Sequence, residues 1–181
     1  MEIKLLSEED KLRYKSDIIE ILERADKEFV PPLSSRVSTS DTDLSGGACN
    51  KNGCLSYYLD MIGGEILGAF SENGLIGFVA FRKNVERPYI GRETFPNVYI
   101  STLVVSPFAR GMGLTKKMYS RLIFEICPEA SFFTRTWSEN GAHLKILSDF
   151  GFTLHKRIPN DRGEGIDTVY LCLQARKPAA V

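Results

Sequence analysis

The chain lacks most of the features that mark large functional classes of protein. Its 181 residues carry 23 basic and 23 acidic side chains, so no net charge favours nucleic acid. No apolar run approaches the roughly 20 residues that a membrane-spanning helix needs. The segment from Met1 to Glu8 has no signal-peptide pattern. We therefore expect a cytoplasmic protein that binds neither nucleic acid nor membrane.

Cysteine and histidine are also scarce, with four and two residues respectively. The cysteines follow neither a zinc-type nor a redox-type spacing, so we expect reduced thiols with structural roles and no metal site. They are Cys49, Cys54, Cys127 and Cys172.

The length and the 43% hydrophobic content suit one domain spanning 1–181. Ser7 is a good helix cap, and Asn73-Gly74 is a strong hairpin signal. Hydrophobic periodicity predicts these elements in order: a helix from 8 to about 27, with Leu12 on its apolar face; a polar loop over 35–53; a short helix over 55–61; strands 65–71 and 75–81; a loop over 84–97; strand 98–106; helix 111–126; strand 132–137; helix 141–150; and strands 152–158 and 168–174.

This order mixes antiparallel strands with one parallel crossover. It predicts an α+β, or mixed α/β, fold with a mostly antiparallel sheet flanked by helices, and not a doubly wound sheet.

The strongest functional signal lies between the strand over 98–106 and the helix that follows it. Gly111 and Gly113 form the turn between them, so several backbone amides should converge where the helix begins. Such helix N-termini bind phosphate, because their amides are unpaired and the helix dipole favours an anion.

The charges around this turn agree with an anion site. The segment from Thr94 to Phe124 has no acidic residue, although 23 of the 181 residues are acidic. Two lysines in the first turn of a helix oppose its dipole, and an anionic ligand would relieve that conflict. The basic residues of the segment are Arg110, Lys116, Lys117 and Arg121.

Two known phosphate-binding motifs fit this turn poorly, and a third interpretation gives the turn no ligand at all. A P-loop requires a Lys-Ser/Thr pair after the last glycine, but Leu114 and Thr115 stand there. A dinucleotide-binding fingerprint requires a third glycine where Lys116 stands, and an antiparallel hairpin precedes the motif. The two glycines could also build no more than a tight strand-to-helix turn.

A fourth interpretation accounts for more of the chain, because the sequence resembles the GNAT superfamily of N-acetyltransferases over about 65–174. The family's pyrophosphate-binding pattern, [QR]-x-x-G-x-[GA], appears as Arg110 to Thr115, with Thr115 where Gly or Ala is usual. A Val-x-Pro lead-in appears as Val105 to Pro107. An asparagine-led helix and a Gly-Phe pair appear as Asn140 and Gly151-Phe152.

The resemblance implies acetyl-CoA as cosubstrate. Its pyrophosphate would lie over the turn, its pantetheine arm would pair with the strand backbone, and a backbone amide near Leu103 or Val104 would meet the thioester oxygen. It also implies a splayed parallel strand pair at this site. It places the acceptor on the side of the N-terminal region 1–64, near Phe29 to Ser34 and the loop from Arg36 to Gly53. The implied cofactor-binding residues are Leu103, Val104, Val105, Arg110, Gly111, Met112, Gly113, Leu114, Thr115 and Asn140.

The acid–base residues depart from the family pattern. Many members have a glutamate where Ser101 stands, and a tyrosine four residues before the Gly-Phe pair, where Leu147 stands. Candidate substitutes that could act directly or through water are Ser101, Glu93, Tyr99, Asn140, Asp60, Tyr57, Tyr58 and His143.

Two functions of different classes follow. The first is an N-acetyltransferase that acetylates a primary amine of a small molecule or peptide by direct transfer. The second is an acyl-CoA-binding module with weak or no turnover and a sensing or partner-binding role. Similarity to the family implies a monomer or a homodimer.

Overall fold

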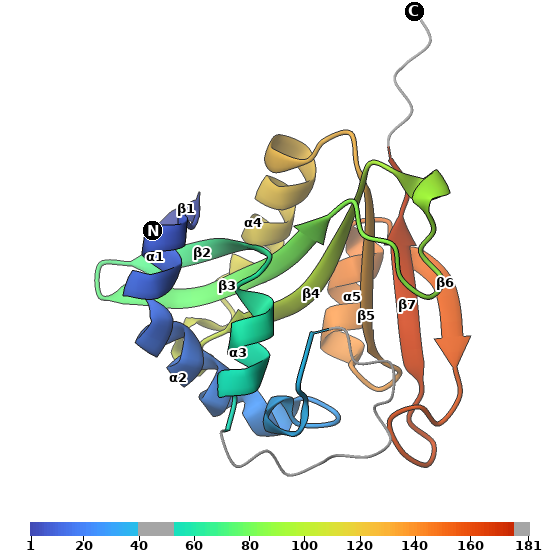
Figure 1. The fold of residues 1–181 in the computed structure, drawn as a ribbon, viewed down its shortest axis with the longest axis horizontal. Helices are drawn as coiled ribbons and strands as arrows, with labels where there is room; N and C mark the ends of the chain where they lie inside the picture. Colours follow the sequence, from blue (N-terminus) through green and yellow to red (C-terminus); the bar gives the residue numbers. More distant parts are fainter. Residues whose placement is uncertain (40–52, 176–181) are drawn as a thin grey trace, which may run out of the picture.

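A computed structural model describes residues 1–39 and 53–175 of the chain (Figure 1). Within these residues, seven strands form one sheet in the order β1-β2-β3-β4-β5-β7-β6. Strands β4 and β5 run parallel, and the other neighbouring pairs are antiparallel, which confirms the mixed α+β prediction. The strands are β1 (Glu2–Leu5), β2 (Glu65–Ser71), β3 (Gly74–Lys83), β4 (Asn97–Val105), β5 (Ser131–Trp137), β6 (Thr153–Ile158) and β7 (Thr168–Leu173).

Helices cover both faces of the sheet (Figure 1). Those before the hairpin, α1 to α3, lie on one face, and α4 and α5 lie on the other. The helices are α1 (Glu8–Arg13), α2 (Lys15–Ala25), α3 (Leu55–Met61), α4 (Leu114–Arg121) and α5 (Gly141–Asp149). Short helical turns are η1 (Asp26–Glu28), η2 (Leu33–Ser35), η3 (Arg92–Thr94), η4 (Pro107–Ala109) and the π-helical η5 (Leu122–Ile126).

A separate apolar core holds each helical layer to the sheet. Met118 and Leu122 of the α4 segment pack with Leu147 of α5 against the side chains of β2 to β5 and β7 on one face. Ile18 and Leu22 of α2 pack with residues of α3 on the other. The site therefore rests on a sheet that is fixed from both sides.

The N-terminal segment differs from its prediction in three ways. Ser7 caps α1 as expected, because its hydroxyl accepts a hydrogen bond from the Asp10 amide at 3.0 Å. The predicted single helix, however, breaks at Tyr14 and ends at Ala25. Leu12 is 69% exposed and so does not face the core. The four-residue edge strand β1 was not predicted, since so short a segment shows no clear alternation.

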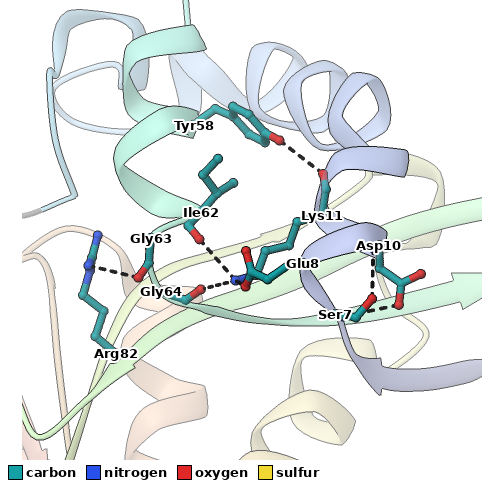
Figure 2. A network of polar contacts seen from close by, with 9 residues as sticks. All are labelled: Ser7, Glu8, Asp10, Lys11, Tyr58, Ile62, Gly63, Gly64 and Arg82. Carbon is teal, nitrogen blue, oxygen red and sulfur yellow. Dashed lines mark hydrogen bonds and ion pairs between the residues drawn. The ribbon is translucent and has the colours of Figure 1, made fainter.

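A buried lysine explains how α1 is fastened to α3 (Figure 2). Lys11 is only 5% exposed, and its ammonium donates hydrogen bonds to Ile62 O at 3.2 Å and Gly64 O at 2.7 Å, just beyond α3. It also pairs with Glu8 at 2.5 Å. Tyr58 donates in return to the Lys11 carbonyl at 3.2 Å. A cation is favourable here because the carbonyls at a helix C-terminus are partly negative.

The remaining predicted elements occur with small shifts. The hairpin turns at Gly74 as predicted, with a φ of 115°. The helix after the phosphate-type turn begins at Leu114, three residues later than expected, and passes into the π-helical turn at Leu122. The predicted loop over 35–53 lies largely outside the described residues.

The described cysteines are Cys54, Cys127 and Cys172, and all three are free and buried. Burial raises the pKa of Cys54 to about 12 and that of Cys172 to about 11, so both remain unreactive thiols. The fourth, Cys49, lies outside the described residues. Over 1–39 and 53–175, no cluster of side chains could hold a metal ion, and no helix could cross a membrane.

Candidate functional site

A cleft opens where two parallel strands separate. Strands β4 and β5 pair from Asn97 to Ile100 on one side and from Ser131 to Thr134 on the other. Beyond these residues they diverge, and a cleft of about 330 Å³ lies between Ile100–Val105 and Thr134–Trp137. The pairing of β4 with β3 continues to Val105, so β4 stays extended while its other edge faces the cleft.

A β-bulge at Ser101 marks the point of separation. Ala80 pairs with Thr102 while its neighbour Phe81 pairs with Ile100, so Ser101 has no partner on β3. Its hydroxyl instead donates to Ala80 O at 3.2 Å. An extra residue reverses the alternation of side chains along a strand.

The bulge decides which side chains of β4 face each helical layer. Before it, Val98 and Ile100 pack on the α4 face. After it, Val104 packs with α2 and α3, and the Thr102 hydroxyl lies 2.7 Å from that of Tyr57 in α3. The wall of the cleft on the side of α2 and α3 is therefore built on this register change.

The glycine turn presents free amides at one edge of the cleft. Gly111 and Gly113 have φ values of 77° and 70°, which glycine adopts without strain. The Lys117 amide donates to Gly113 O at 3.1 Å, as the first hydrogen bond of α4. The amides of Leu114 and Thr115 therefore have no acceptor within the helix. This is the arrangement that binds phosphate.

Folding brings carboxylates from other elements next to the segment from Thr94 to Phe124, which has no acidic residue of its own. The Arg110 guanidinium donates to both carboxylate oxygens of Glu28 at 2.9 Å, and to Val105 O at 3.3 Å. Lys116 pairs with Asp149 at 2.8 Å. The Asp149 carboxylate of α5 therefore offsets part of the Lys116 charge within the protein itself.

A polar network from α5 borders the same cleft. Asn140 caps α5 by accepting from the His143 amide at 3.4 Å, and its amide group donates to the Thr136 hydroxyl at 3.0 Å. The His143 ring lies 2.7 Å from the hydroxyl of buried Tyr119. Burial lowers the pKa of His143 to about 4, so its imidazole is neutral at pH 7.

The structure brings most of the predicted cofactor-binding residues together. Gly111 to Leu114 form the turn, with Met112 59% exposed and Leu114 buried beneath it. The predicted residues that line the cleft itself are Ser101, Leu103, Val104, Val105, Arg110, Thr115, Asn140 and His143.

Several acid–base candidates lie away from the cleft. Tyr99 is buried beside Ile90, Phe133 and Cys172, and Glu93 lies on η3. Neither lines the cleft, so the structure does not support these two candidates.

The other candidates from the α3 region have structural partners. Tyr57 and Tyr58 are each 1% exposed within the core. The Asp60 carboxylate accepts from the Thr39 amide at 2.8 Å and pairs with Arg82 at 3.5 Å. Within the described cleft lining, Glu28 has the only carboxylate and His143 the only imidazole.

Sequence reasoning missed the cationic part of the cleft. Arg36, Arg135 and Arg162 all line it, as do the rings of Phe29 and Trp137. The family resemblance indicated the segments that begin at Phe29 and Arg36, but Arg135, Trp137 and Arg162 follow no motif, so no sequence signal could have found them.

Comparison with solved structures supports a GNAT fold. The Salmonella typhimurium protein yncA, whose structure contains its cofactor acetyl-CoA, superposes with a TM-score of 0.67 at 24% identity, covering 100% of this chain and 97% of that one. An N-acetyltransferase from Staphylococcus aureus Mu50 gives 0.65 at 15% identity, covering 96% and 97%. The ribosomal-protein-S18-alanine N-acetyltransferase of Escherichia coli gives 0.66 at 14% identity, covering 99% and 97%. At these identities the likeness establishes the fold.

Sequence comparison establishes the family. No curated protein sequence matches the chain significantly. The model of the acetyltransferase (GNAT) family matches residues 23–152, which include α3, α4 and α5 and the whole of the cleft-forming strands β4 and β5. The chain therefore belongs to the GNAT family of acetyltransferases.

Proposed function

We propose that this acetyltransferase uses acetyl-CoA to acetylate a primary amine of a small molecule or peptide by direct transfer. The observation that carries the proposal is the cleft between β4 and β5, which joins a phosphate-binding turn to a pocket lined by arginines. Holding both substrates in one cleft would supply most of the rate enhancement through proximity.

The residues at the turn fit the diphosphate of CoA. Gly113 has a φ that residues other than glycine rarely adopt, and the amides after it are unpaired within the helix. The edge of β4 that β5 leaves, from Leu103 to Val105, suits a pantetheine arm that pairs like an added strand. A backbone amide near Leu103 or Val104 would donate to the thioester oxygen and stabilise the charge that develops on it. Asn140 would hydrogen-bond the pantetheine or the backbone near it.

Acetyl-CoA would supply an activated thioester. Neither His143 nor Glu28 in the described cleft lining is well suited to transfer the protons, so we assign that role to water. The amine must lose a proton before it attacks, and the departing thiolate must gain one. Neutral His143, with a pKa of about 4, is a weak base. The Glu28 carboxylate is occupied by Arg110. We infer that cleft water exchanges both protons.

The alternative is an acyl-CoA-binding module without turnover. It is favoured because neither of the two positions where many family members have an acid–base side chain carries one here. Ser101 lies on the bulge, and Leu147 is completely buried in the core.

Calorimetric titration with acetyl-CoA, followed by turnover with a panel of amines, tests the proposal. We expect micromolar binding that ATP and NAD do not displace, and CoA release with at least one primary amine. Binding without turnover of any amine would favour the module. No binding by folded protein would remove the basis for both functions.

Glu28 offers a further prediction about the glycine turn. Glu28→Gln removes a negative charge beside the phosphate site and frees Arg110. We expect CoA affinity to rise about 3- to 10-fold, because less repulsion opposes the phosphates. Calorimetry on the variant measures this. Glu20→Gln is the matched control, because Glu20 forms an exposed pair with Arg24 on α2. Weaker binding by Glu28→Gln would show instead that Glu28 holds Arg110 in its productive position.

A further inference from the structure

Three guanidinium groups converge on the part of the cleft that faces away from α4. Arg36 follows η2, Arg135 lies on β5, and Arg162 lies between β6 and β7, and all three line the cleft. On β5, Phe132 packs on the α4 face and Phe133 on the opposite one. Because side chains alternate along a strand, Arg135 lies on the face opposite α4.

The two arginines on the β5 side are held without a carboxylate partner. Arg162 is 7% exposed, and it donates to the Thr168 hydroxyl at 2.9 Å and to the Val30 carbonyl. Its guanidinium carbon lies 5.9 Å from the centre of the Trp137 ring. Half-buried Arg135 forms no ion pair with any residue over 1–39 or 53–175. These positive charges therefore rest against neutral groups.

The positive charges also act on one another. Burial, followed by the charges of Arg36 and Arg135, lowers the pKa of Arg162 to about 9. Asp161 partly opposes this effect, but its carboxylate accepts a hydrogen bond from the Thr168 hydroxyl at 2.5 Å. Buried like charges are costly unless an anion is present. An anion bound between Arg135 and Arg162 would reduce this cost.

Resting on the function proposed above, we propose that the acceptor is a small amine that also carries a carboxylate, such as an α-amino acid, and that Arg135 and Arg162 bind this carboxylate. Arginine is suited to the task, because its planar fork donates two parallel hydrogen bonds to a carboxylate. The carboxylate would hold the amine on the cleft side facing away from α4, with the thioester on the β4 side.

Aromatic rings beside the arginines provide a surface for the rest of the acceptor. Phe29 and Trp137 both line the cleft, with ring centres 6.0 Å apart. Arg36 lies over the Phe29 ring at 5.7 Å and donates to Pro31 O at 2.6 Å. An apolar side chain on the acceptor would contact these rings. A cleft of about 330 Å³ would take the pantetheine arm together with a small acceptor.

Matched acceptors test the proposal. Turnover is compared for amino acids, their carboxamides and the corresponding decarboxylated amines with the same side chains. We expect kcat/KM to be about 10- to 100-fold higher for the acids, because each charge-assisted hydrogen bond to the carboxylate is lost in the other two. Equal or better turnover of the carboxamides or plain amines would overturn the proposal.

Substitution of Arg135 assigns the preference to this residue. Arg135→Gln should raise KM for the acids at least about 10-fold, lower the preference for acids over carboxamides correspondingly, and leave acetyl-CoA affinity unchanged. Arg135→Lys should recover part of the preference. Arg24→Gln, on an exposed face of α2, is the control for loss of an arginine. An unchanged acid preference, or a loss of acetyl-CoA affinity instead, would contradict the assignment.

A binding measurement separates failure of this proposal from failure of the acetyltransferase function. The CoA complex of the folded protein is titrated with the same acids and carboxamides, which requires no turnover. Binding of acids that Arg135→Gln abolishes would support the carboxylate site even if no amine were acetylated. Equal affinity for acid and carboxamide would overturn the site, whatever the activity.

Discussion

Replacing Gly113 with valine is expected to abolish CoA binding while the protein remains folded. Gly113 caps α4 with a φ of 70°, a region that β-branched residues avoid. Valine would force the turn to rearrange and would redirect the amides that follow it. Each hydrogen bond from an amide to a phosphate contributes about 1.5–3 kcal/mol, so losing two should lower CoA affinity about 100-fold or more. Calorimetry with CoA measures the change.

A second glycine supplies the control for backbone strain. Gly74→Val puts valine at a φ of 115° in the β2–β3 hairpin, away from the cleft. At Gly74, as at Gly113, an added Cβ meets open space, so the two substitutions differ in position and not in steric clash. We expect this variant to lose stability but to bind CoA normally. Arg110→Glu should also abolish binding, because it places a second carboxylate beside Glu28. Normal CoA affinity in both Gly113→Val and Arg110→Glu would refute the proposed phosphate site.

Leu147→Ala is expected to cost about 2–5 kcal/mol of unfolding free energy. Leu147 is 0% exposed and packs in the core between α4, α5 and the sheet. Removing its isobutyl group leaves a cavity that the surrounding residues fill only in part. For a chain of this size the melting temperature should fall by roughly 2–4 °C for each kcal/mol, which calorimetry or thermal circular dichroism measures.

Leu12→Ala is the matched control, because Leu12 is also helical but 69% exposed. Its effect should stay within about 0.5 kcal/mol. An unchanged melting temperature for Leu147→Ala would instead indicate that Leu147 faces the cleft. That result would return this position, where many family members have a tyrosine, to the list of groups near the leaving thiolate.

Local chemistry made much of the fold predictable from the sequence. The Asn73-Gly74 turn, the Ser7 cap and Gly151 after α5 each act within a few residues, and each lies where the sequence predicts. The glycine turn before α4 is equally local, since positive φ values at Gly111 and Gly113 aim the following amides. The family resemblance also rested on short motifs, among them this glycine turn and the Gly151-Phe152 pair.

Elements that depend on distant partners were not predictable. Lys11 is buried because carbonyls beyond α3 accept hydrogen bonds from its ammonium, and nothing near Lys11 in sequence indicates this. The bulge at Ser101 is a property of the register between β3 and β4, and a single strand carries no register.

The sequence by itself determined the family, the order of the elements from the 55–61 helix onward and the phosphate-type turn, because motifs and periodicity act over short separations. Tertiary structure decided the charge of the site. It paired Arg110 with Glu28, which is 82 residues away, and gathered Arg135 and Arg162 from segments on either side of α5. Electrostatic interactions follow distance in space, and folding alone sets which charges become neighbours.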